Sequence, residues 1–295
     1  MRVLVTGATG FIGQHVVRSL SGAGHRILGT SRSPVPMPGL TNLDLCEYRM
    51  GDPLPRTITE WVPEAVVHLA WEGIPDFSRQ LCICNVDDQT RFFQLAVQLP
   101  SVRRVVAAGS CREYGAAIGR SSGSVEVVPD SDFGWAKASL HRILQAECAE
   151  AQVGLTWFRL FYVYGPGQRH RSLVPTILDQ LASGDSLVVE HPDAAKDFVY
   201  VVDVADAVER AVHSTGVHDV IDLGIGRLQR VQEVLNAVSA GSDLAAQPVG
   251  ERYRPPVDGL WANLDTARDI LGWQPTTGLV EGIHLTRVAR EGPRT

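Results

Sequence analysis

A glycine-rich turn near the start of the chain constrains the fold more than any other stretch. Arg2 to Thr6 are typical of a short buried strand, and residues 7–13 follow as a turn into a helix. Gly7 suits the tight turn, Gly10 lets the backbone approach a pyrophosphate, and Gly13 lets the helix pack close to the sheet. The unpaired N–H groups and the positive dipole end of that helix favour phosphates. The stretch therefore predicts a dinucleotide-binding turn that opens an α/β domain.

The residues after the second expected strand bear on the choice of dinucleotide. Residues 26–30 form that strand, and Ser31 and Arg32 come directly after it. Sites that prefer NAD commonly carry Asp or Glu here to hold the ribose 2′-hydroxyl, whereas a hydroxyl and a guanidinium suit a 2′-phosphate. We therefore expect NADP(H), with NAD less favoured; a solvated loop residue is the alternative reading of Arg32.

Further apolar runs alternate with helical stretches, as in a parallel sheet with helices on both faces. Strands are expected at residues 40–45, 65–70, 103–108 and 155–161, and long helices at residues 77–99 and 133–151. The fold class predicted is a doubly wound parallel Rossmann sheet with a smaller C-terminal substrate-binding α/β lobe. Residues 1–162 form the dinucleotide-binding domain, with segments near 191–225 returning to it, and residues 163–190 and 226–295 form the lobe.

Composition excludes several classes of function. The 295 residues carry a formal net charge of −6, which gives no overall field to attract nucleic acid or an anionic membrane. No apolar run approaches the roughly 18 residues of a membrane span, and a cytoplasmic protein is expected. The five cysteines have neither disulfide-framework nor CxxC spacing, so no metal site is expected.

Several separated segments together resemble the extended short-chain dehydrogenase/reductases that act on nucleotide-sugars. The matching segments are residues 6–13, Asp44-Leu45, His68-Leu69-Ala70, Asn85, Ser110 with Tyr114-Gly115, Lys137, Arg159 with Val163-Tyr164-Gly165-Pro166, residues 196–199 and residues 271–275. Residues 68–73 and 157–165 look most similar to bacterial reductases of dTDP-4-keto-6-deoxy sugars. The resemblance spans nearly the whole chain and implies a nucleotide-sugar substrate. It also implies a homodimer built as a four-helix bundle from the helices at residues 77–99 and 133–151.

The resemblance also implies roles for individual residues. In this family a Ser or Thr at the position of Ser110 hydrogen-bonds the substrate oxygen, a Tyr exchanges a proton with it, and a Lys four residues later holds the nicotinamide ribose. The catalytic positions are Ser110, Lys137 and Phe133 at the Tyr position, with Tyr114 as a further candidate. Cofactor contacts are expected from Gly7, Gly10, Phe11, Ile12, Gly13, Ser31, Arg32, Asp44, Leu45, Leu69, Ala70, Trp71, Asn85 and Lys137. Substrate contacts are expected from Cys111, Arg112, Tyr162, Arg171, Lys196 and Arg254.

Phe133 departs from the family pattern, because a phenyl ring cannot donate a proton. General acid–base catalysis contributes about 10²- to 10⁴-fold, so the loss raises the barrier by roughly 3 to 5 kcal/mol unless another group substitutes. Three readings stay open. Ser110, Tyr114, Cys111, Tyr162 or a water molecule replaces the donor; or the protein binds cofactor and sugar without turnover; or the chain is a Tyr→Phe variant made to trap a substrate.

Two other departures narrow the expected reaction. The acid pair of the family's dehydratases falls on Cys111 and Arg112, which disfavours dehydration, and the family's Asn before the Tyr-Gly-Pro turn is Tyr162. The resulting prediction is an NADP(H)-dependent 4-ketoreductase of a dTDP-linked 4-keto-6-deoxyhexose. A nucleotide-sugar epimerase, or a redox-silent member that only binds its ligands, are the alternatives.

Overall fold

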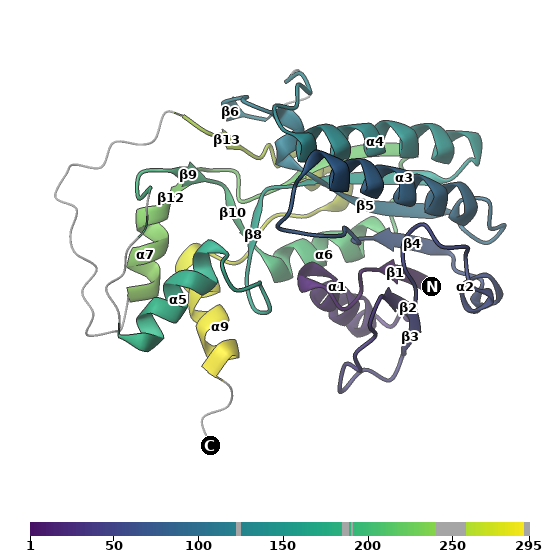
Figure 1. The fold of residues 1–295 in the computed structure, drawn as a ribbon, viewed down its shortest axis with the longest axis horizontal. Helices are drawn as coiled ribbons and strands as arrows, with labels where there is room; N and C mark the ends of the chain where they lie inside the picture. The colour runs from purple at the N-terminus through teal and green to yellow at the C-terminus, as the bar shows by residue number, and fades with distance from the viewer. Residues whose placement is uncertain (122–124, 185–188, 190, 240–257, 292–295) are drawn as a thin grey trace.

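Seven parallel strands form the central sheet of the protein (Figure 1). The structure is a computed structural model that describes residues 1–121, 125–184, 189, 191–239 and 258–291. The strands lie in the order β11-β7-β5-β4-β1-β2-β3. Their bounds are β1 (Arg2–Thr6), β2 (Arg26–Ser31), β3 (Leu43–Glu47), β4 (Ala65–His68), β5 (Arg104–Ser110), β7 (Gly154–Leu160) and β11 (His218–Leu223). The order reverses between β1 and β4, which is where an open α/β sheet binds a dinucleotide.

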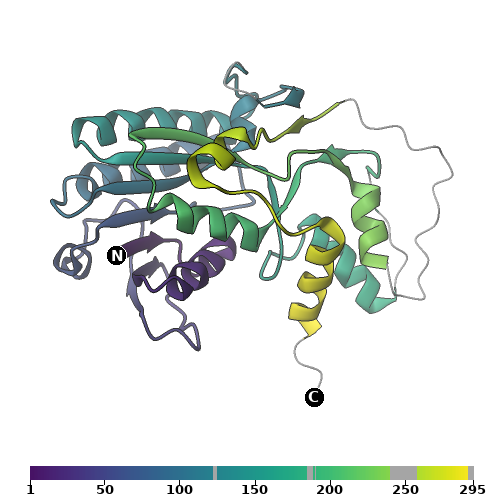
Figure 2. The same ribbon diagram turned by 180° about the vertical axis from the view of Figure 1, so that it is seen from behind.

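Helices cover both faces of this sheet. On one face lie α3 (Arg79–Ala96) and α4 (Asp132–Glu150), and on the other lie α1 (Phe11–Gly22) and α6 (Val201–Ala211), as Figure 1 and the reverse view in Figure 2 show. Successive side chains of a strand point to opposite faces. Accordingly, Val3 and Val5 pack in the core beneath α1 and α6, whereas Leu4 packs in the core beneath α3 and α4. The predicted doubly wound α/β fold is confirmed.

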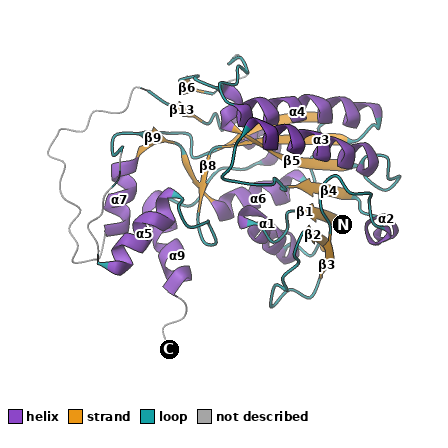
Figure 3. Cartoon of the chain, in the orientation of Figure 1, coloured by secondary structure: helices purple, strands orange, loops and turns teal. Residues whose placement is uncertain are grey.

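A smaller lobe stands at the carboxyl edge of the sheet (Figure 3). Its helices are α5 (Leu173–Ser183), α7 (Val231–Ser239) and α9 (Leu279–Glu291), and its short strands pair as β8 (Tyr162–Tyr164) with β10 (Phe198–Tyr200) and β9 (Ala195–Lys196) with β12 (Gln229–Arg230). The lobe has its own apolar core, which includes Ile177, Val234 and Ile283. The remaining elements are α2 (Arg56–Trp61), a 3-10 turn over Cys111–Tyr114, and the strand pair β6 (Gly119–Arg120) with β13 (Leu260–Trp261).

The structure draws the boundary between sheet and lobe differently from the sequence prediction. Of the segment 191–225, α6 and β11 return to the sheet, whereas β9 and β10 pair within the lobe. Helix α8 (Asp265–Leu271), expected in the lobe, packs instead against β11 and α6. Trp273 explains this placement, because its ring is 1% exposed in the main core and its Nε1 donates to the carbonyl oxygen of Asp203 at 3.0 Å. No helix in the described part of the chain is long and apolar enough to cross a membrane.

Candidate active site

The glycine turn between β1 and α1 has the shape of a phosphate cradle. Gly7 has φ +70°, and a Cβ there would lie 2.9 Å from the backbone nitrogen of Ala70. A Cβ on Gly13 would overlap the carbonyl oxygen of Gly7. Helix α1 begins at Phe11, and among the described residues no side chain caps its N-terminus and no acidic residue lies in its first turn. The turn therefore directs the uncapped N-terminus of α1, with its helix dipole, to the carboxyl edge of the sheet, an arrangement that favours an anion.

The ends of β2 and β3 form the second part of the expected cofactor region. Ser31 closes β2, and its Oγ accepts a hydrogen bond from Thr9 Oγ1 at 2.7 Å. The Arg32 side chain is 57% exposed and pairs with Glu72 at 3.2 Å. A pocket of about 370 Å³ lies beside it, lined by Arg32, Glu47, Tyr48, Arg49, Asp52, Pro53 and Pro55. Arg32 thus lines a pocket at the end of β2.

Asp44 and Leu45, expected at the cofactor edge, lie instead in the middle of β3. They pair with Leu28 and Gly29, and the strand continues to Glu47, which pairs with Ser31. The sequence placed the end of this strand at Leu45, because apolar pattern alone does not set the register against β2. Tyr48, Arg49 and Asp52 are consequently the residues at this edge that the sequence reasoning missed. Gly51-Asp52-Pro53, a turn signal, was the available clue.

A cavity of about 440 Å³ opens between the carboxyl edge of the sheet and the lobe. Its walls come from both parts of the molecule and are largely apolar. They comprise Phe11, Ile12, Leu69, Trp71, Ile74, Phe77, Ala108, Gly109, Ser110, Phe133, Lys137, Leu160, Phe161, Tyr162, Val163, Tyr164, Gln168, Arg169, Ser172, Leu173, Val174 and Phe198. The structure therefore brings Ser110, Phe133, Lys137 and Tyr162 together with the first residues of α1 in the wall of one cavity.

Two polar atoms in the cavity walls are buried without a hydrogen-bond partner among the described residues. They are Nε1 of Trp71 and Oε1 of Gln168. A buried polar group without a partner costs free energy, which a ligand with matching groups would recover. The cavity therefore suits a ligand that accepts a hydrogen bond from Trp71 and donates one to Gln168. Aromatic side chains form much of the wall around these two groups.

Ser110 is held at the end of β5 by a capping box. Its Oγ accepts from the backbone N–H of Arg112 at 3.2 Å, and its own backbone N–H donates to Oε1 of Glu113 at 2.8 Å. Because the hydroxyl accepts from Arg112, its proton is left for an acceptor in the cavity. Glu113 is therefore a positioning residue for Ser110. The sequence reasoning did not single it out, although the Ser-x-x-Glu spacing of a capping box was visible.

Lys137 lies on α4, which begins at Asp132 with Ser131 as its cap. The side chain is buried, its Nζ donates to the carbonyl oxygen of Ala108 at 2.8 Å, and the Trp71 ring lies 4.1 Å from Nζ. Burial lowers the pKa of Lys137 to about 7, although Glu113 acts in the opposite direction. An amine with this pKa exchanges its proton near neutral pH.

Phe133 lies one helical turn before Lys137 in an aromatic cluster. Its ring centroid is 5.2 Å from that of Trp71 in an edge-to-face contact and 4.7 Å from that of Phe77. The ring therefore fills the cavity wall and holds Trp71 against Lys137. Phe77 was not among the expected site residues, since it carries no polar group.

Tyr114 does not point into the cavity. Its hydroxyl donates to Asp222 at 3.0 Å and accepts from Arg159 at 2.9 Å, while Arg159 also pairs with Glu113 at 2.9 Å. Burial raises the pKa of Tyr114 well above its usual value, so it retains its proton. Tyr114 lies on the 3-10 turn after Ser110, and its ring points into the protein toward Arg159 and Asp222. The spacing of residues in the sequence does not reveal this direction. This buried network ties together β5, β7 and β11.

Cys111 and Arg112 also lie outside the cavity wall. Burial raises the pKa of the Cys111 thiol to about 12, and Arg112 is exposed. Of the donors considered to replace the tyrosine, the structure therefore places Ser110 and Tyr162 at the cavity, and Tyr114 and Cys111 away from it.

Asn85 and His68 hold the loop and strand beneath the site. Asn85 accepts from the backbone N–H of Glu72 at 2.8 Å and donates to the carbonyl oxygen of Glu72 at 3.1 Å, which fixes the loop that carries Trp71. The ring nitrogens of His68 bond Thr6 at 2.8 Å and Gln89 at 2.6 Å, and burial lowers the pKa of His68 to about 3. Both residues are buried and position the loop and the strand beneath the cavity without lining it.

The remaining substrate candidates spread over the lobe. The Lys196 ammonium lies 5.2 Å from the centroid of the Tyr162 ring, which itself lines the cavity. Arg171 is exposed, has φ 73°, and precedes Ser172 at the start of α5. Arg254 lies outside the described residues. Arg169, which the sequence reasoning did not consider, is in the cavity wall and donates to the carbonyl oxygen of Ile74. The turn signal Gly165-Pro166-Gly167, shortly before Arg169, was the feature of the sequence that could have indicated a loop at the site.

Comparison with known proteins shows the family of the chain. A model described as "NAD dependent epimerase/dehydratase family" matches residues 3–224. This chain belongs to that family. The match runs from β1 through β11, so it covers the glycine turn, Ser110 and Lys137.

The relatives in this family act on sugar nucleotides. UDP-glucose 4-epimerase of Mycolicibacterium smegmatis is 28% identical, and the alignment covers 97% of each chain. A dTDP-6-deoxy-L-talose 4-dehydrogenase (NAD(P)(+)) of Kitasatospora kifunensis is 27% identical over 96% of this chain and 93% of that one.

Solved structures share the fold over their full length. MoeE5 in complex with UDP-glucuronic acid and NAD has 27% identity and a TM-score of 0.85, with 99% of both chains covered. MoeE5 with UDP-glucose and NAD gives a TM-score of 0.84 at the same identity. Family members are thus NAD-dependent enzymes of nucleotide-sugars, and these structural neighbours hold NAD.

Proposed function

We propose that the protein is an NADP(H)-dependent 4-ketoreductase of a dTDP-linked 4-keto-6-deoxyhexose. The observation that carries the proposal is one cavity that joins Ser110, Lys137 and the glycine turn. The dTDP-6-deoxy-L-talose 4-dehydrogenase relative supports this substrate class. Cys111 and Arg112 stand where dehydratases carry their acid pair, which argues against elimination.

Two features of the glycine turn support a dinucleotide here. Gly7 and Gly13 let the turn fold tightly against Ala70 and against its own backbone, and no side chain among the described residues caps the start of α1. Gly7, Gly10 and the start of α1 would hold its pyrophosphate, and Leu69, Ala70 and Trp71 would flank it from the end of β4. When bound, the nicotinamide carries the hydride to or from C4 of the sugar. The protein contributes position, hydrogen bonds and the proton.

Ser110 is assigned as the hydrogen-bond donor to the C4 oxygen. The donation to its Oγ from Arg112 orients the hydroxyl, and the cavity walls around it are largely apolar, so the bond is stronger than in solvent. In the reduction, the oxygen gains negative charge as C4 accepts hydride. A donor fixed at that oxygen stabilises the charge as it develops.

Lys137 is assigned as the source of the proton that Phe133 cannot supply. One of its three N–H groups is committed to Ala108, and two are left for the cavity. Its pKa of about 7 matches the condition for an efficient acid at neutral pH. The proton passes to the C4 oxygen directly or through Ser110, and the neutral amine is reprotonated from solvent.

The preference for NADP rests on Ser31 and Arg32 at the end of β2. Arg32 lines a pocket together with Tyr48 and Arg49, and a 2′-phosphate bound there would compete with Glu72 for its guanidinium. NAD is the cofactor in the structural neighbours, so the two dinucleotides must be compared directly.

The decisive experiment measures NADPH and NADH consumption with a dTDP-4-keto-6-deoxyhexose. We expect slow turnover by the wild-type protein and a kcat raised by about 10²-fold in Phe133→Tyr, because the added hydroxyl restores a second acid in the cavity wall. Phe77→Tyr is the matched control, since it adds the same group to the neighbouring ring. If neither the wild type nor Phe133→Tyr turns over, the 4-ketoreductase assignment fails.

Two alternatives are supported by specific observations. The UDP-glucose 4-epimerase relative and the neighbours with NAD favour an epimerase, which would retain one tightly held dinucleotide per chain after purification. Phe133 favours a redox-silent protein, which would bind both ligands and stay inert even as Phe133→Tyr. Cofactor content and calorimetric binding of dTDP-sugar separate these outcomes from reduction.

We further propose that the protein is a homodimer through α3 and α4. These helices lie side by side on one face of the sheet. Ile83 and Leu95 on α3 and Trp135 on α4 are exposed apolar side chains. A second copy would bury these apolar side chains in a four-helix bundle.

A further inference from the structure

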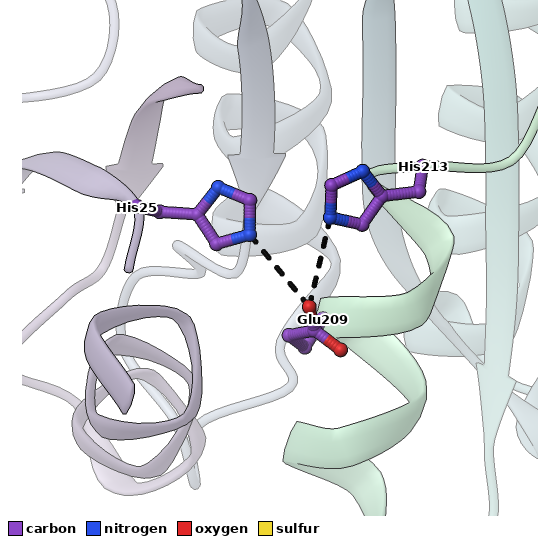
Figure 4. Close-up of side chains that lie close together, drawn as sticks. All are labelled: His25, Glu209 and His213. Atoms are coloured by element: carbon purple, nitrogen blue, oxygen red, sulfur yellow. Dashed lines mark ion pairs between the residues drawn. The ribbon is translucent and has the colours of Figure 1, made fainter. Parts of the chain in front are cut away.

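A cluster of two histidines and one glutamate lies at the amino edge of the sheet, the edge opposite to the cavity. His25 directly precedes β2, while Glu209 is in the last turn of α6 and His213 follows that helix (Figure 4). These are the only three His, Cys, Asp or Glu side chains in the described part of the chain whose ligand atoms gather within 4.8 Å of one another. We infer that they form a binding site for a divalent transition-metal ion, and specifically for Zn²⁺.

The distances in the cluster suit an ion better than hydrogen bonds. Nε2 of His25 and Nε2 of His213 each lie 3.6 Å from Oε1 of Glu209. This is too long for a hydrogen bond. Two ligands at tetrahedral positions around zinc, with bonds of 2.0 to 2.2 Å, are about 3.4 Å apart. Figure 4 shows both Nε2 atoms directed at the same carboxylate oxygen, so small side-chain adjustments would place an ion among the three.

His25 gives the independent indication of a missing ligand. The residue is 3% exposed, and neither ring nitrogen has a hydrogen-bond partner among the described residues. Its Nε2 has an ion-pair contact with Glu209, which attracts the ring only when the imidazole is protonated. A buried imidazole without hydrogen-bond partners is costly, and coordination of Nε2 would remove part of that cost.

The chemistry of the donors suits zinc. Two imidazoles and one carboxylate are a ligand set that zinc accepts, with a fourth position open to water. The His213 side chain is 55% exposed, so that position faces solvent. The ion would also lie at the C-terminal end of α6, where the helix dipole favours a positive charge. By contrast, His141 and His218 are only a pair, with Nε2 atoms at 3.0 Å in hydrogen-bond contact.

The site would fasten α6 to the start of β2, two elements far apart in the sequence. Since an ion that binds only the folded state stabilises it, Zn²⁺ should raise the melting temperature in proportion to the logarithm of its concentration. No step of the proposed reduction involves this edge. The inference therefore stands or falls independently of the proposed function, although it departs from the sequence-based expectation that no metal is bound.

The test is calorimetric titration of Zn²⁺ into tag-free, chelator-treated protein at pH 7.5, together with thermal melts. We expect one ion per chain, and a dissociation constant at least about tenfold higher in His213→Gln, an exposed position where loss of folding is not expected. His284→Gln, which changes an exposed histidine on α9, should bind as the wild type does. Co²⁺ should give the visible absorption of a four-coordinate site in the wild type and not in Glu209→Gln. Absence of stoichiometric binding, or equal binding by His213→Gln, would overturn the site.

Discussion

Lys137 is the residue whose charge decides how activity depends on pH. Its pKa is lowered by burial to about 7, and the proposed reduction uses its protonated form. We therefore expect kcat/KM for ketone reduction to be level below pH 7 and to fall about tenfold per pH unit above it. The measurement is a pH profile of NADPH consumption. Lys137→Met should give a low and flat profile, and a wild-type rate that rises above pH 7 would contradict the assignment.

Arg32 is the residue that should separate NADPH from NADH. Its guanidinium forms an exposed ion pair with Glu72, and such pairs contribute little to the free energy of unfolding. A charge-assisted bond to phosphate is worth about 1.5 to 3 kcal/mol, so Arg32→Ala should weaken NADPH binding by roughly 10- to 100-fold. NADH affinity should change little. Calorimetric titration of both dinucleotides checks this, with Arg26→Ala at the other end of β2 as control. Equal losses for the two would show that Arg32 does not read the 2′-phosphate.

At the scale of elements, the turn from β1 to α1 is the most constrained part of the site. Gly13→Ala would place a Cβ against the carbonyl oxygen of Gly7 and push α1 away from the sheet. We expect it to lower the free energy of unfolding by about 1 to 3 kcal/mol and to abolish dinucleotide binding. Gly22→Ala, in the last turn of the same helix, meets nothing within 4 Å and should be neutral or slightly stabilising. Urea titrations of the two variants, with NADPH titrations, give the comparison. A folded Gly13→Ala protein with unchanged affinity would refute the cradle.

The elements that the sequence predicted well are those set by local pattern. Buried runs of valine and leucine marked the central strands, and the glycine turn marked the cofactor edge. The end of β3 was misplaced because its register depends on pairing with β2, which no local pattern encodes. The inward direction of Tyr114 depends on Arg159 and Asp222, from other strands. Contacts between distant segments, including those around His25, therefore required the structure.

At the scale of the whole molecule, the lobe and the sheet are joined by more than the chain crossing between them. Asp197, between β9 and β10, accepts hydrogen bonds from the backbone of Ile225 at 2.6 Å and of Ala262 at 2.9 Å. Burial raises the pKa of Asp197 to about 6, while those backbone bonds act in the opposite direction. This carboxyl thus ties the segment before α8 to the base of the lobe. The sequence divided these segments between two domains, because it could not show that α8 packs on the sheet.

The face formed by α3 and α4 sets the expected assembly. Leu95 on α3 is 48% exposed, and Trp135 on α4 is 55% exposed, on helices that pack along each other. A dimer through this face leaves the cavity open, because the cavity lies at the carboxyl edge between sheet and lobe. We expect the wild type to elute as a dimer and Leu95→Glu as a monomer, since an uncompensated charge buried in such an interface costs about 3 to 5 kcal/mol. Light scattering after size exclusion measures this, and Val280→Glu on α9 supplies an exposed apolar position remote from the face. A wild type that is monomeric at every concentration would exclude the dimer, and a Leu95→Glu protein that stays dimeric would place the interface elsewhere. A monomeric Leu95→Glu protein that keeps its turnover would show that each chain carries a complete site.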